Sequence, residues 1–137
     1  ATMALLGNSK LTVVGDIQQE WIRLNGETAV NYPMTVLAVD GAFAAVNREL
    51  INIILDNVKA SVRWVQENPA AAGQLVEKHE LGLRAAAVSA AIPKSNYVFI
   101  PAQEARPDLE ALYRVFLDFV PASIGGKLPG DDFYYKQ

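Results

Sequence analysis

A nearly continuous apolar run, YPMTVLAV, extends from Tyr32 to Val39 and limits the folds that this chain can adopt. A run of this length without alternation is typical of a β-strand that is covered on both faces, as in a parallel or mixed sheet flanked by helices. Two shorter runs, from Lys10 to Val14 and from Tyr97 to Ile100, predict further strands. The sequence therefore predicts an α/β fold in which helices pack on a small mixed sheet.

Helical spacing of apolar residues is clearest from Leu50 to Val65, where polar residues occupy the other faces. Asn68 and Pro69 end this helix and begin another that extends to His79, because Asn suits an N-cap and Pro is tolerated at the first helical position. Four other helices are expected over residues 1–6, after Asp16, over Leu83–Ala91, and from near Pro107 to Val120.

Composition excludes several classes of protein. Hydrophobic residues make up 51% and charged residues 20% of the 137 residues, which argues for a folded domain and against disorder. A net charge of -3, without a clustered run of Lys or Arg, argues against nucleic acid as a partner. No cysteine is present, so disulfides and thiolate chemistry are excluded from this sequence.

No catalytic residue, metal site or cofactor is predicted. His79 is the single histidine and falls at the end of a predicted helix, without the second ligand that a metal motif needs. The candidate ligand-binding residues are Tyr32, Ser95 and Asn96, which precede predicted strands, because sites in α/β proteins gather at strand ends and loop edges. The same residues also suit an aromatic ring at a strand entry and an ordinary turn.

Three segments in order, YPMTVLAVDGAF, SVRWVQENPAAAGQLVEKH and AAIPKSNYVFIPAQEA, resemble the second half of type II periplasmic binding proteins of the nitrate, sulfonate and thiamine-precursor group. By this resemblance, residues 1–32 complete a second lobe, residues 33–39 cross the hinge, and residues 40–137 return to the first lobe. The apolar strand, Trp64 and the Asn68–Pro69 step occupy the family's places.

The resemblance implies the substrate-binding component of an ABC importer, which closes two lobes on a small polar or anionic solute and docks on a membrane permease. It also implies a periplasmic or membrane-anchored location, with the export signal outside this sequence. Two alternatives remain: a ligand-sensing module, and an enzyme similar to the pyrimidine synthases of the same fold. Since the family's first half is missing, we expect the chain to self-associate through apolar surface that this half would cover.

Overall fold

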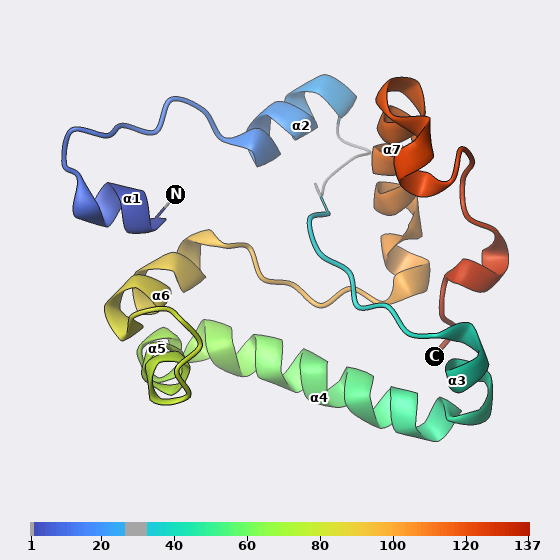
Figure 1. Cartoon of the computed structure of the whole chain (residues 1–137), viewed down its shortest axis with the longest axis horizontal. Helices are drawn as coiled ribbons and strands as arrows, with labels where there is room; N and C mark the ends of the chain where they lie inside the picture. The colour runs from blue at the N-terminus through green and yellow to red at the C-terminus, as the bar shows by residue number, and fades with distance from the viewer. Residues whose placement is uncertain (1, 27–32) are drawn as a thin grey trace. The chain divides into compact units, whose positions relative to one another are not determined.

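The computed structural model describes residues 2–26 and 33–137, which form helices joined by irregular segments (Figure 1). The α-helices of the described residues are α1 (Thr2–Gly7), α2 (Ile17–Asn25), α3 (Gly41–Val46), α4 (Arg48–Glu67), α5 (Pro69–Lys78), α6 (Ala85–Ala91) and α7 (Ala102–Phe119). Short 3-10 helices are η1 (Ile92–Lys94), η2 (Pro121–Ile124) and η3 (Asp131–Phe133).

The predicted α/β fold is wrong, because the residues that the structure describes contain no strand and so no mixed sheet. The three runs predicted as strands are irregular chain wherever they are described, and Tyr32, the first residue of the longest run, lies outside the described residues. A strand is stable only when its backbone pairs with that of another strand. No described segment supplies such a partner, so the apolar runs have no ladder to join.

One compact unit comprises the described residues up to Val13 together with Gly41–Phe99. Its longest helix is α4, which confirms the helix predicted from Leu50 to Val65. The predicted break after it is also confirmed, since Pro69 is the first residue of α5. Asn68 precedes it, but its side chain makes no capping hydrogen bond to α5, and its nitrogen instead donates to the Trp64 carbonyl oxygen at 3.0 Å. Proline has no backbone N–H, and the first residue of a helix does not need one, so a helix can begin at Pro69 at little cost in stability.

Helices α5 and α6 pack closely within this unit. Ala72 and Gly73 of α5 and Ala87 of α6 are buried, and these small residues let the two backbones approach each other. Ser89 Oγ donates to the Ala85 carbonyl oxygen at 2.8 Å, directly beside Gly73. A further hydrogen bond joins the two helices at the start of α6, where the Ala85 N–H donates to the Glu77 carboxylate at 3.3 Å.

The second compact unit comprises the described residues of Val14–Asp40 and Ile100–Gln137. Asp16 caps α2 by accepting from the N–H groups of Gln18 and Gln19 at 2.9 and 3.2 Å, which confirms the short helix expected there. Trp21 of α2 packs against Leu112 of α7, and both are buried. This aromatic contact is the centre of the unit's small core.

Helix α7 begins at Ala102 rather than near the predicted start at Pro107, so Pro107 lies inside it.

Contacts of Arg106 hold the C-terminal segment against α7. Arg106 donates to Glu110 and to Asp131, each at 2.7 Å, and its guanidinium lies 4.7 Å above the centre of the Tyr134 ring. Charged and stacking contacts of this kind favour arginine over lysine.

Many large apolar side chains remain exposed on both units, and the most exposed include Val14, Met34, Val46 and Phe119. Fully buried large side chains are absent from the described residues. Among the described helices, none combines the length and the apolar character needed to cross a membrane. The described chain therefore covers only part of its own apolar surface.

Candidate functional site

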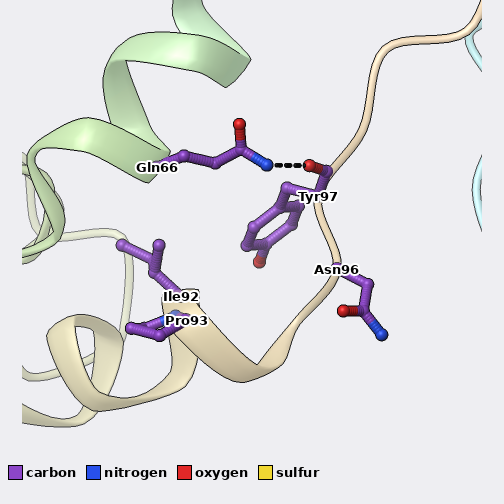
Figure 2. A pocket seen from close by; sticks show the side chains of 5 residues that line it. All are labelled: Gln66, Ile92, Pro93, Asn96 and Tyr97. Atoms are coloured by element: carbon purple, nitrogen blue, oxygen red, sulfur yellow. Dashed lines mark hydrogen bonds between the residues drawn. The ribbon is translucent and has the colours of Figure 1, made fainter.

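A pocket of about 240 Å³ lies within the first unit, at the point where the end of α4 meets the segment that follows α6 (Figure 2). Its lining residues are Gln66, Ile92, Pro93, Asn96 and Tyr97. Gln66 comes from the last turn of α4, and Ile92 and Pro93 belong to η1. The pocket thus joins a helix end to a chain segment some thirty residues further on.

A hydrogen bond fixes this junction. The Gln66 side-chain nitrogen donates to the Tyr97 carbonyl oxygen, as the dashed line in Figure 2 marks. Ile92 is buried and supplies an apolar wall, and the Tyr97 ring extends from the irregular segment toward the same region. The result is an apolar surface beside a carboxamide, a combination that is common in pockets for small molecules.

Asn96 has a left-handed backbone, with φ of 46°. Asn tolerates this conformation better than most residues, and such residues recur in turns and at ligand sites. The Asn96 side chain is exposed and points away from Gln66 and the Tyr97 ring in Figure 2. It makes no hydrogen bond to another described residue, so its amide donor and acceptor are available at the edge of the pocket.

The three candidate residues predicted from the sequence have different positions. Asn96 lines the pocket, whereas Tyr32 lies outside the described residues. Ser95 follows η1 directly but is not one of the lining residues, and its hydroxyl donates to the Ala91 carbonyl oxygen at 2.8 Å. Ser95 therefore stabilises the turn that presents Asn96.

Sequence reasoning missed Gln66 and Tyr97. Gln66 lies on the polar side of a predicted amphipathic helix, where a glutamine carries no functional signal. Tyr97 was treated as the first residue of a short strand. Their hydrogen bond connects positions 31 residues apart, and no local pattern reports a contact of that separation. Asn96 was predicted from its place before an expected strand, and that strand is irregular chain in the structure.

The lining of the pocket holds no carboxylate, amine, imidazole or thiol side chain. Its lining side chains are two carboxamides, two apolar groups and one phenol. Acid–base or nucleophilic catalysis needs a titratable group with a suitable partner, which these five residues do not include. His79 is exposed at the C-terminal end of α5, which confirms its predicted place at a helix end.

Comparisons of this chain with protein-family models, with curated proteins and with solved structures found no match. The family resemblance therefore stays a prediction from the sequence.

Proposed function

We propose that this chain binds a small polar solute and releases it unchanged, as part of the substrate-binding component of an ABC importer. The observation that carries the binding role is the pocket itself, where the Gln66 carboxamide and the Tyr97 ring lie beside the buried Ile92. The assignment to an importer is supported by the order of the three sequence segments that resemble periplasmic binding proteins. The two arguments are independent, so each can be tested alone.

The lining narrows the kind of solute. Carboxamides donate and accept hydrogen bonds without carrying charge, and no lysine or arginine is among the lining residues. An anion buried there would lose its hydration without gaining a cation, which is costly. A volume of about 240 Å³ also falls below the range of about 300–1,000 Å³ typical of pockets for drug-sized ligands. We therefore favour a small, uncharged polar solute over an anionic one.

A thermal-shift screen tests the binding role. A panel of uncharged polar solutes and of small anions is added to the chain, and the melting temperature is measured for each. A solute at 100 times its dissociation constant stabilises the folded state by about 2.7 kcal/mol, which is readily detected. We expect uncharged members of the panel to raise the melting temperature and the anions to leave it unchanged. After prolonged incubation with the chain, each solute should be recovered chemically unchanged.

A pair of matched variants locates the binding site. Asn96 and Glu80 both have left-handed backbones, with φ of 46° and 53°. Glycine adopts this conformation without strain, so Asn96→Gly and Glu80→Gly should affect the backbone alike. Only Asn96→Gly removes the amide at the edge of the pocket, and it should weaken binding by about 2- to 10-fold, the value of one neutral hydrogen bond. Equal affinities of the two variants would reject this pocket as the site.

A further inference from the structure

The segment 96–100, which follows η1 at the edge of the pocket, is held in place by very few hydrogen bonds. Before it, Ser95 donates its N–H and its hydroxyl to carbonyl oxygens of η1 and of the end of α6. After it, the Pro101 carbonyl oxygen accepts from the first turn of α7. Between these two points, the bond from Gln66 to the Tyr97 carbonyl oxygen is the one hydrogen bond that the segment makes with other described residues. One side chain of α4 therefore fixes the position of this segment.

Tyr97 is the residue of this segment whose ring lines the pocket. The residue is 49% exposed, and Figure 2 shows the ring extending from the segment toward Ile92 and Pro93. Val98, the next residue, is 61% exposed, so its packing adds little to the hold on the ring. A half-exposed ring on an irregular segment keeps one position only if its backbone is held. The Gln66 bond supplies that hold, because it acts on the carbonyl group of Tyr97 itself.

We infer that Gln66 is a positioning residue, which holds the Tyr97 ring in place for a solute and contributes to affinity through Tyr97. This inference rests on the binding role proposed above. A ring that is already ordered adds no ordering cost when the solute binds, whereas a ring on a loose segment must be ordered by the solute. The donor nitrogen of Gln66 is the group that matters, since a carbonyl oxygen can only accept. Arg63 and Glu67, its neighbours on α4, bond to each other at 2.8 Å and not to the segment.

Two substitutions separate the donor from the rest of the amide. Gln66→Glu keeps the shape but has no donor at neutral pH, and Gln66→Lys has a donor but no amide. Calorimetry measures the dissociation constants of three uncharged probes, glucose, erythritol and nicotinamide. For the probe that binds most tightly, Gln66→Glu should weaken binding by about 2- to 10-fold, and Gln66→Lys should weaken it less. Gln74→Glu and Gln74→Lys, at an exposed position of α5, are the matched controls and should bind like the original chain.

Fluorine NMR reports the position of the Tyr97 ring without any solute. The chain has five tyrosines, so labelling with 3-fluorotyrosine gives one resonance for each, and Tyr97→Phe assigns that of Tyr97. Gln66→Glu should move the Tyr97 resonance toward its position in the unfolded chain, and Gln66→Lys should move it less. The resonance of Tyr134, which belongs to the other unit, should stay unchanged in both variants.

Weakening by Gln66→Lys equal to or greater than that by Gln66→Glu would overturn the inference, because it would show that the amide itself contacts the solute. Full affinity in Gln66→Glu, the same weakening in the Gln74 variants, or an unchanged Tyr97 resonance would overturn it as well. In these cases, binding by the original chain and weaker binding by Asn96→Gly would leave the proposed function standing. Binding of none of the three probes would reject the proposed function together with this inference.

Discussion

Gly73 offers a sharp test of the packing between α5 and α6. A glycine inside a helix normally costs stability, so replacing it by alanine should stabilise the helix by about 0.8–1.0 kcal/mol. At Gly73, however, an added Cβ would lie within 3.0 Å of both Ser89 Oγ and the Ala85 carbonyl oxygen, and 3.1 Å from the Ala85 carbonyl carbon. The serine can rotate away, but the Ala85 atoms belong to the backbone and cannot. We therefore expect Gly73→Ala to push the two helices apart.

The expected size follows from two opposing terms. Inserting a methyl group into a closely packed contact costs about 1–3 kcal/mol. Because Ala85 is backbone, the upper part of this range applies here, and subtracting the gain in helix propensity leaves a net destabilisation of about 1–2 kcal/mol. In a unit of this size each kcal/mol lowers the melting temperature by about 4–8 °C. Gly73→Ala should thus lower the melting temperature by about 5–15 °C.

Differential scanning calorimetry measures this change, and Gly41→Ala is the matched control. Gly41 is the first residue of α3, and nothing lies within 4 Å of a Cβ built on it. Gly41→Ala should leave the melting temperature unchanged or raise it slightly. Adding Ser89→Ala to Gly73→Ala should recover only part of the loss, since the Ala85 contact remains. A Gly73→Ala variant as stable as the original chain would show that the two helices do not pack as described.

The second unit yields two further predictions. Arg106→Ala should lower the melting temperature more than Arg114→Ala does. Arg106 bridges Glu110 and Asp131 and stacks on Tyr134, whereas Arg114 lies 3.7 Å from Glu110 and is 65% exposed. Equal shifts of the melting temperature in calorimetry would contradict this. Burial, with a smaller effect from Glu110, raises the pKa of Tyr134. Above about pH 10 the unfolded chain therefore loses the Tyr134 proton while the folded chain keeps it. The unfolded state then binds fewer protons than the folded state, so the stability of the fold decreases as the pH rises. Tyr134→Phe should therefore lose less stability between neutral pH and strongly alkaline pH, and an unchanged pH profile would argue against this assignment.

Helices were predictable from the sequence because each one is specified locally. The boundaries of α4 and α5 follow from apolar spacing and from the Asn68–Pro69 step, all of which operate within one or two turns. The start of α7 was misplaced because Pro107 suits the first turn of a helix better than its interior, and the sequence gives no sign that five residues precede it in the helix. Helix α3 was missed because Gly41–Val46 is too short for periodicity to show.

Of the candidate residues, Asn96 is the one that lines the pocket, and the structure removes the reason for which it was predicted. Asn96 was predicted because it precedes an expected strand in a segment between prolines, but that strand is irregular chain, and the left-handed φ of 46° at Asn96 is a conformation that asparagine tolerates. Gln66 enters the pocket through a contact with Tyr97 across 31 residues, which depends on how α4 and η1 pack. Packing of this kind is decided by the whole unit and leaves no local trace in the sequence.

The apolar run from Tyr32 to Val39 shows why strands were predicted wrongly where helices were not. A helix satisfies its backbone within one segment, whereas a strand needs hydrogen bonds from a second segment, so a composition typical of strands determines only half of the structure. In the described residues no second segment pairs with Met34–Val39, which stays exposed.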